Sequence, residues 1–143
     1  MTKTICFDFG NTRLKAAVFE NEKFSTEIIL QDDEPGLGIL PGHAPLITEL
    51  QIGEISYRRD KLVRYLSVAW GFCEVLPDRV IVLAEIAEKA EEIDEQRASA
   101  AKDRAEKRLA DVQNPDIDFD RAAVALQRAI SRIQTSRKHG SPE

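Results

Sequence analysis

The hydrophobic pattern along the chain changes its period once, near Ala84. From residue 4 to residue 84, short apolar or alternating runs are separated by clusters of Gly, Pro, Asn and Asp, a pattern that predicts β-strands joined by turns. The runs are ICFDF, LKAAVFE, FSTEIIL, GILP, PLITEL, EISYRR, LVRYLSVAW, FCEVL and RVIVLAE. Many short strands at close spacing are typical of a sandwich or a barrel.

Beyond Ala84 the apolar positions follow a helical period. The segment is rich in Ala, Glu, Lys and Arg, residues that favour helix intrinsically. We expect this first helix to run from about Ala84 to about Asp111. Its apolar stripe consists of Ile86, Ala90, Ile93, Ala101 and Ala105.

A second helix is predicted after the turn-forming stretch VQNPDID. Asp118 can cap its first turn by accepting backbone N–H groups, and the helix should continue to about Arg137. Its apolar face consists of Phe119, Leu126, Ile130 and Ile133. The final residues, RKHGSPE, form a frayed tail.

The sequence therefore predicts an α+β protein, an N-terminal β-sandwich of short strands followed by a C-terminal antiparallel two-helix hairpin. The sandwich domain should span residues 1–84, with 1–32 as an atypical segment, the hairpin 85–138 and a disordered tail 139–143. The first helix presents mainly alanine, and buried alanine stabilises far less than a large aliphatic side chain. We expect the hairpin to be weakly held and able to detach.

Charge is distributed unevenly along the chain. The net charge is −5, from 25 acidic and 20 basic residues, yet residues 121–138 contain five basic and no acidic residues. Residues 85–111 are acidic overall, with nine acids against six bases. A basic segment with an apolar stripe fits an acidic protein surface or a nucleotide, while a plain solvated face is the alternative.

Composition limits the possible classes of protein. A chain of 143 residues can bury one ordinary core but not a two-lobed enzyme. Two cysteines suit a reducing cytoplasm, and the start MTKTICFDFG lacks the layout of a signal peptide. No apolar run approaches the roughly 20 residues of a membrane helix. His43 has no Cys or second His nearby in the sequence. We therefore expect it to be a hydrogen-bonded turn residue and predict no metal site.

Two long motifs resemble the epsilon subunit of F-type ATP synthases over about residues 36–138. They are LGILPGHAPLIT and WGFCEVLPDRVIVLAEIAEKAEEID, followed by an alanine-rich hairpin. The resemblance implies a central-stalk subunit whose sandwich binds the gamma subunit and the c-ring of the membrane sector. It implies that the C-terminal helices regulate ATP hydrolysis, while the chain has no catalytic residues and requires no cofactor.

This resemblance also bears on partners and location. The implied protein is cytoplasmic and peripheral to the inner (plasma) membrane through the complex, with no membrane span and no nucleic-acid partner. The basic second helix would face acidic surfaces of the catalytic subunits.

The segment IDEQRA, residues 93–98, resembles a motif through which some bacterial epsilon subunits bind ATP. The resemblance implies a weak ATP site. Its residues would be Glu88, Ile93, Asp94, Arg97, Arg104, Arg128 and Arg132, of which the last two match only after a one-residue shift.

The helical period places Ile93, Arg97 and Arg104 within about 40° of one another, with Arg108 close by. Arginines in a helix seam need an anionic partner, because an uncompensated buried charge is costly. The second helix offers no acid beyond Asp120. The closed hairpin must therefore use an outside anion such as nucleotide phosphate, use carboxylates from elsewhere, or leave these arginines in water.

The front of the chain carries a different signature, because DFGNTRLK resembles the first phosphate motif of type III pantothenate kinases. The resemblance implies that Asp8 coordinates magnesium-bound phosphate and that Lys15 adds positive charge. The other residues of this phosphate-loop-like set are Gly10, Asn11 and Thr12. It covers only residues 3–20, and the second lobe of such a kinase is missing.

Three interpretations of the front end remain. DFGN is a hairpin turn between two strands that either join the sandwich or form a detached hairpin. Alternatively, the chain is a truncated or fused pantothenate kinase fragment that phosphorylates pantothenate with ATP. The third interpretation is a chimera that folds but performs neither role, because its hybrid first strands spoil the interface.

Overall fold

The computed structural model describes residues 3–8, 15–20, 28–31, 37–40, 43–59 and 62–138. Side chains are described from residue 38 onward within these ranges, except at 58, 59 and 62. Gly10, Asn11 and Thr12 of the phosphate-loop-like set lie outside the described residues.

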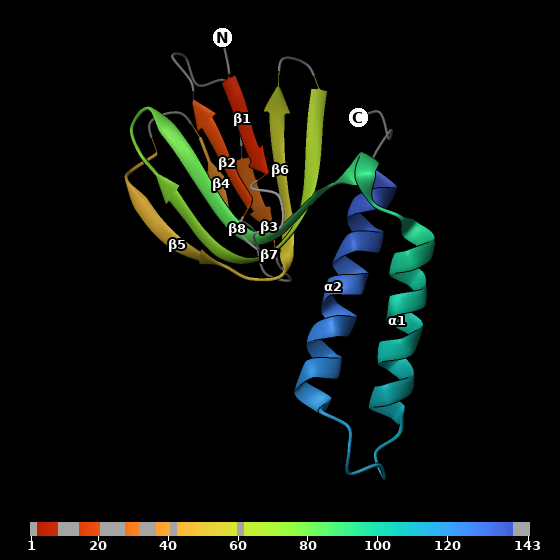
Figure 1. Cartoon of the computed structure of the whole chain (residues 1–143). Coiled ribbons are helices and arrows are strands. Elements are labelled where there is room, and N and C mark those ends of the chain that lie inside the picture. Colours follow the sequence, from red (N-terminus) through yellow and green to blue (C-terminus); the bar gives the residue numbers. More distant parts are fainter. Residues whose placement is uncertain are drawn as a thin grey trace.

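The described strands form one antiparallel arrangement with the order β1-β2-β8-β7-β6-β3-β4, and β5 pairs with β7. Figure 1 shows that they build a β domain beside which two helices lie. The predicted fold class, a β-sandwich followed by a helix hairpin, is confirmed. The strands are β1 Lys3–Asp8, β2 Lys15–Glu20, β3 Ile28–Gln31, β4 Leu37–Ile39, β5 Leu46–Leu50, β6 Gly53–Arg59, β7 Leu62–Val75 and β8 Arg79–Lys89.

Strand β7 is the longest strand, and it changes partners at a corner. Its first half, up to Val68, pairs with β6, whereas its second half, from Gly71, pairs with β5. At the corner Trp70 has φ 54° and Gly71 has φ 130°. The sequence predicted two separate strands here, LVRYLSVAW and FCEVL. The structure has one strand, because the positive φ values turn the backbone without ending its pairing with β8.

The core of the β domain is made by alternate residues of neighbouring strands. Along β7 the core positions are Leu66 and Val68 before the corner, and Cys73 and Val75 after it. Val68 and Cys73 are separated by an odd number of positions, so the inward face of β7 switches at the corner. The full core cluster is Ile39, Leu50, Ile55, Leu66, Val68, Cys73, Val75, Val80, Val82 and Ala84.

The front strands join the sheet. The β2 ladder runs along β8 from Lys15 opposite Ala84 to Glu20 opposite Arg79, and β1 pairs with the other edge of β2. The detached hairpin is therefore not what the structure shows. Strand pairing depends on alternation and length more than on residue identity, which allows this segment to extend the sheet.

The helical part begins later than the sequence predicted. Strand β8 continues to Lys89, and a short 3-10 helix, η1 (Ala90–Glu92), precedes α1 (Glu95–Ala110). The predicted start near Ala84 was wrong because Ile86 pairs with Ala69 in the β7–β8 ladder. This cross-strand pairing outweighs the local helix preference of the segment.

Helix α2 (Phe119–Lys138) follows the loop as predicted. The carboxylate of Asp118 accepts a hydrogen bond from the backbone N–H of Arg121 at 2.9 Å, which confirms the predicted cap. The helices pack through small residues, since the buried apolar positions of α1 and α2 are Ala98, Ala105, Ala122 and Ala129. In Figure 1 α2 lies between α1 and the sheet, and α2 is the helix that contacts β6 and β7.

Candidate functional site

The sheet presents a row of polar side chains to α2. In the register of three neighbouring strands, Glu54 on β6 lies opposite Ser67 on β7, and Ser67 lies opposite Glu88 on β8. The alternate residues Ile55, Leu66 and Val68 point into the core, so this row points outward, toward the helix. We call Glu54, Ser67 and Glu88 the acid row.

Each member of the acid row meets a partner on α2. The Lys138 ammonium lies 2.8 Å from Glu54 Oε1, and Arg132 Nε lies 2.9 Å from Glu88 Oε2. Between them, Ser131 Oγ donates to the backbone carbonyl of Gly53 at 3.0 Å. The sheet thus supplies carboxylates to residues 121–138 of the basic helix, which contain none.

The central contact of this interface joins two serines. Because Ser131 donates its only hydroxyl proton to the Gly53 carbonyl, Ser67 Oγ is the donor in the 3.1 Å contact with Ser131 Oγ. Both serines are buried. The interface is therefore polar at its centre as well as at its two ends.

Two buried polar atoms have no hydrogen-bond partner within the described structure, Glu88 Oε2 on β8 and Thr135 Oγ1 on α2. For Glu88 the 2.9 Å approach of Arg132 is thus a charge contact with poor hydrogen-bond alignment. Thr135 is completely buried. An unsatisfied buried hydroxyl costs about 1–3 kcal/mol, whereas the charge of Glu88 is compensated by Arg132.

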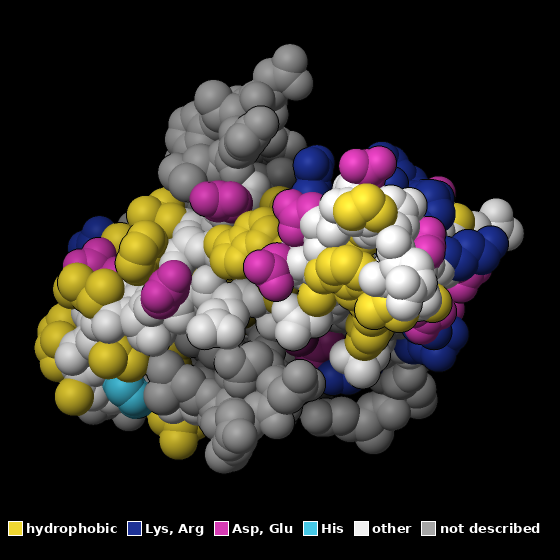
Figure 2. Space-filling view, turned by 90° about the horizontal axis from the view of Figure 1, so that it is seen from below, with side chains coloured by type: hydrophobic (Ala, Val, Ile, Leu, Met, Phe, Trp, Pro, Cys, Tyr) yellow, Lys and Arg dark blue, Asp and Glu magenta, His cyan; other side chains and the backbone are white. Residues whose placement is uncertain are grey.

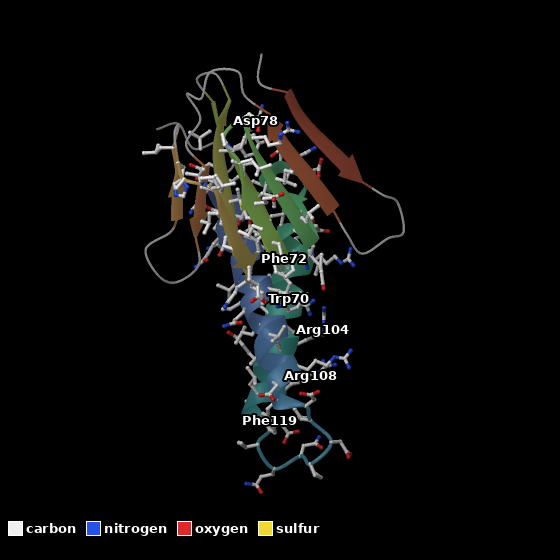
Figure 3. The ribbon with its side chains drawn as sticks, turned by 90° about the vertical axis from the view of Figure 1, so that its left-hand side faces the viewer. Trp70, Phe72, Asp78, Arg104, Arg108 and Phe119 are labelled. Carbon is white, nitrogen blue, oxygen red and sulfur yellow. The ribbon has the colours of Figure 1, made fainter. Side chains whose placement is uncertain are left out.

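A further contact joins α2 to the corner of β7. The Arg128 guanidinium lies over the Trp70 ring, 5.4 Å from the ring centroid. Figure 3 shows Trp70 at the lower end of the sheet, beside the helix pair. Such a cation–π contact contributes about 0.5–1 kcal/mol where it is partly exposed.

The arginines of α1 lie outside the helix seam, which is the third of the alternatives that the sequence left open. Arg97, Arg104 and Arg108 are exposed, whereas Ala98 and Ala105 are buried. Figure 3 shows Arg104 and Arg108 pointing away from the helix pair. The helix turns its smallest side chains inward because two alanines permit close approach without burying charge.

The predicted ATP-site residues are only partly brought together. Glu88 and Arg132 form an ion pair, but Arg128 is stacked on Trp70, and Arg97 is exposed on the other helix. These three arginines therefore have different surroundings. Binding of ATP at this set stays a prediction.

The remaining members of that set have local roles. Asp94 caps α1, its carboxylate accepting the Arg97 backbone N–H at 2.9 Å. Ile93 is half-buried just before the helix, and Arg104 is exposed on α1. The sequence did not identify Asp94 as a cap because the helix was expected to begin ten residues earlier.

The phosphate-loop-like set is described only in its backbone. Asp8 ends β1 directly opposite Lys15 at the start of β2. This register is that of two neighbouring antiparallel strands, and the side chains of both residues lie outside the described part. Among the described residues, no group of three or more His, Cys, Asp or Glu side chains could hold a metal ion.

His43 is a hydrogen-bonded residue, as predicted. Its Nδ1 donates to the backbone carbonyl of Ala44 at 2.8 Å, and its backbone N–H donates to the carbonyl of Leu40 at 3.0 Å.

An exposed apolar surface lies on the β domain. Phe72 on β7 lies opposite Leu83 on β8, and Ile47 on β5 lies opposite Glu74, two positions from Phe72. We call Ile47, Phe72 and Leu83 the apolar strip. Figure 2 shows hydrophobic side chains on this domain when it is seen from below. Phe72 and Glu74 alternate along β7 with Cys73 and Val75, which are buried. This alternation is the sequence signal that would have placed Phe72 on the exposed face of the strand.

Two family models match the chain one after the other. The first, described as the ATP synthase delta/epsilon chain β-sandwich domain, covers residues 15–90. The second, the ATP synthase delta/epsilon chain long α-helix domain, covers residues 91–137. The family match thus begins at β2, earlier than the resemblance predicted from residue 36.

Individual relatives agree. The chain is 50% identical over 103 residues to ATP synthase epsilon chain 2 of Syntrophotalea carbinolica, covering 72% of this chain and 75% of the relative. It is 68% identical over 73 residues to the ATP synthase epsilon chain of Koribacter versatilis, covering 51% of each. The comparisons give no support to the pantothenate kinase resemblance.

A solved structure shows the same fold. A chain of the Euglena gracilis mitochondrial ATP synthase, in the assembly of OSCP, F1 and c-ring, aligns with a TM-score of 0.65 at 21% identity, covering 78% of this chain and 69% of that one. No described helix is long and apolar enough to cross a membrane. The two family models and these relatives show that the chain belongs to the delta/epsilon chain family of ATP synthase, as an epsilon chain.

Proposed function

We propose that the chain is a central-stalk subunit that couples rotation to ATP synthesis and regulates ATP hydrolysis, without catalytic chemistry of its own. The observation that carries this proposal is the succession of the two family matches, over 15–90 and 91–137. They follow the same order as the β domain and the hairpin in the structure. In the cell the chain would be held at the inner (plasma) membrane by the complex, as a peripheral subunit on the cytoplasmic side.

The apolar strip supports a protein partner. Ile47 is 69% exposed and Phe72 is 56% exposed, which is costly for an isolated surface. Exposed apolar side chains rimmed by charged residues are typical of protein interfaces. Glu49 and Glu74 flank this strip in the β5–β7 ladder. We propose that the gamma subunit and the c-ring contact the β domain, with the gamma subunit covering the strip.

The hairpin supports the regulatory part of the proposal. Its seam is lined by alanine, and its contact with the sheet is polar, so it can separate from the β domain at moderate cost. The basic α2 would then face acidic surfaces of the catalytic subunits. If ATP binds here, its phosphates and Glu88 share the Arg132 guanidinium, of which the ion pair engages Nε.

The proposal is tested by adding the chain to an F1 complex of a related bacterium from which the epsilon chain has been removed. We expect the chain to co-purify with the gamma subunit and to lower the rate of ATP hydrolysis. Phe72→Glu should weaken co-purification, whereas Val112→Glu, at a 71% exposed position of the hairpin loop, should not. Failure of the unmodified chain to co-purify would contradict the proposal.

A further inference from the structure

We propose that the outer edge of β1 is a self-association surface, at which a second copy of this chain adds its own β1 in antiparallel orientation. β1 ends the strand order of the sheet, and among the described strands it pairs only with β2. Figure 3 shows β1 as the outermost strand on the right-hand side of the sheet. The inference goes beyond the proposed function, because β1 lies outside the family match, which begins at residue 15.

The sequence of β1 leaves this edge unprotected. Soluble proteins protect their edge strands with proline, with a bulge or with a charge in the middle of the strand. β1 reads KTICFD, with charges only at its two ends, and its ladder with β2 runs through all six residues without a bulge. The open edge of such a strand presents backbone N–H and C=O groups that another strand can bind.

The other described strands that have a single partner are poorer candidates. β4 has three residues, which offer few backbone hydrogen bonds to an added strand. β5 carries Glu49 within its five residues, and a charge of this kind protects an edge from pairing. β1 is therefore the edge at which we expect self-association.

Two-fold symmetry limits the register of two paired β1 strands. In a symmetric pair, residue i faces residue j and residue j faces residue i, so one residue lies opposite its own copy. With Cys6 at this position, Ile5 lies opposite Phe7 twice, whereas with Ile5 at this position Lys3 lies opposite Phe7. Pairs of an aromatic and a β-branched residue stabilise antiparallel strands. We therefore infer the register with Cys6 opposite Cys6.

The two-fold arrangement also continues the buried face of the sheet. The ladders place four residues in one row across β1, β2, β8 and β7, namely Cys6, Ala17, Val82 and Cys73. Val82 and Cys73 are buried. Because the axis stands perpendicular to the sheet, the core side of one copy meets the core side of the other, and the row runs through both. A different protein would have to supply an open edge with the same alternation, whereas every copy of this chain carries both.

The first test measures the oligomeric state of the full chain against its concentration, by sedimentation under reducing conditions. We expect a reversible dimer whose fraction rises with concentration. Ile5→Lys should raise the concentration at the midpoint by about tenfold, because both pairs of Ile5 with Phe7 are lost. Ile81→Lys is the matched control, since Ile81 lies in the same row as Ile5 but on β8, which is paired on both edges. It should leave the midpoint unchanged.

Oxidation provides a second test, which does not depend on how Ile5→Lys folds. Directly opposite residues of antiparallel strands have Cβ atoms about 4.5–5.5 Å apart, which a disulfide can span after small adjustments. Diamide, which takes up one hydrogen from each of two thiols, should therefore join the Cys6 residues of two copies. Cys73 is fully buried and should not react. In a Cys6→Ser background, Ile5→Cys and Thr4→Cys should cross-link much more slowly, because neither residue lies opposite its own copy in this register.

Each alternative predicts a different result. A chain that stays monomeric at every concentration would overturn the inference. Equal weakening by Ile5→Lys and Ile81→Lys would place the contact on the face of the sheet and not at its edge. Cross-linking at the same rate through residues 4, 5 and 6 would mean random collision, and faster cross-linking through residue 5 would contradict the register. The assays contain no ATP synthase component, so their failure is distinct from failure to co-purify with the gamma subunit.

Discussion

Arg128 of α2 stacks over Trp70 at the corner of β7, with its guanidinium carbon 5.4 Å from the ring centroid. Trp70 is the only tryptophan of the chain, and it sits where the β domain meets the hairpin. Its fluorescence should therefore report whether α2 is docked.

Salt should release the hairpin and change that fluorescence. The ion pairs of Arg132 and Lys138 are partly exposed, so raising the salt concentration to about 1 M, where the screening length is about 3 Å, weakens them. We expect Trp70 emission to shift to longer wavelength and to become more accessible to acrylamide. Arg128→Ala should produce part of this change at low salt. Emission that is independent of salt would argue against an electrostatic dock.

Gly71 should be intolerant of any side chain. Its φ is 130°, and a Cβ atom at this position would lie 1.9 Å from the backbone carbonyl oxygen of Leu83. Because backbone must move to relieve this contact, Gly71→Ala should lower the free energy of unfolding by about 3 kcal/mol or more, measured by urea denaturation. Gly38→Ala is the control, since nothing lies within 4 Å of its added Cβ. Similar small losses at both sites would contradict the predicted backbone clash.

The alanine seam should reject larger residues. Ala129 is 2% exposed, whereas Ala123 on the same helix is exposed. Ala129→Leu should therefore destabilise the hairpin by about 1–3 kcal/mol through overpacking, and Ala123→Leu should change stability little. Hydrogen exchange of α1 amides is the measurement, because it separates opening of the hairpin from unfolding of the β domain. Identical exchange in both variants would show that the seam is loose.

The sequence predicted correctly what depends on neighbouring residues. It failed where the structure depends on contacts between distant segments. Asp118 was identified as a cap because capping depends only on the residues that follow it. The start of α1 was misplaced because the pairing of Ile86 with Ala69 joins distant segments. The helical period grouped Arg97 with Arg104, but it cannot tell which side of a helix faces its neighbour.

The acid row shows the same limit at the site. Glu54, Ser67 and Glu88 come from three strands, and only the register of two ladders places them in one line. The charge pattern did indicate that α2 is basic and suits an acidic surface, which would supply carboxylates. It could not say that the sheet supplies them, because that depends on how the hairpin packs.

Binding of ATP through the IDEQRA segment can be tested by calorimetry. If the resemblance holds, titration with ATP gives a weak saturable heat that Arg97→Ala abolishes, because a planar guanidinium binds phosphate oxygens well. Arg108→Ala removes another exposed base of α1 outside the predicted set and should leave the heat unchanged. Absence of heat with the unmodified chain would remove ATP as a ligand.

Cys73 should make stability fall at alkaline pH. Burial raises the pKa of its thiol from 9.0 to about 11, so the folded chain holds this proton over a range of pH in which the unfolded chain releases it. The stabilisation is complete below about pH 9 and is lost progressively as pH rises toward 11. Lysines and tyrosines titrate in the same range, which makes a difference measurement necessary. Urea denaturation of a Cys6→Ser chain should lose stability with pH more steeply than that of a chain carrying both Cys6→Ser and Cys73→Ala. Parallel pH dependence in the two chains would mean that the thiol titrates equally in the folded and unfolded states, and that Cys73 is not held in the core as the structure shows.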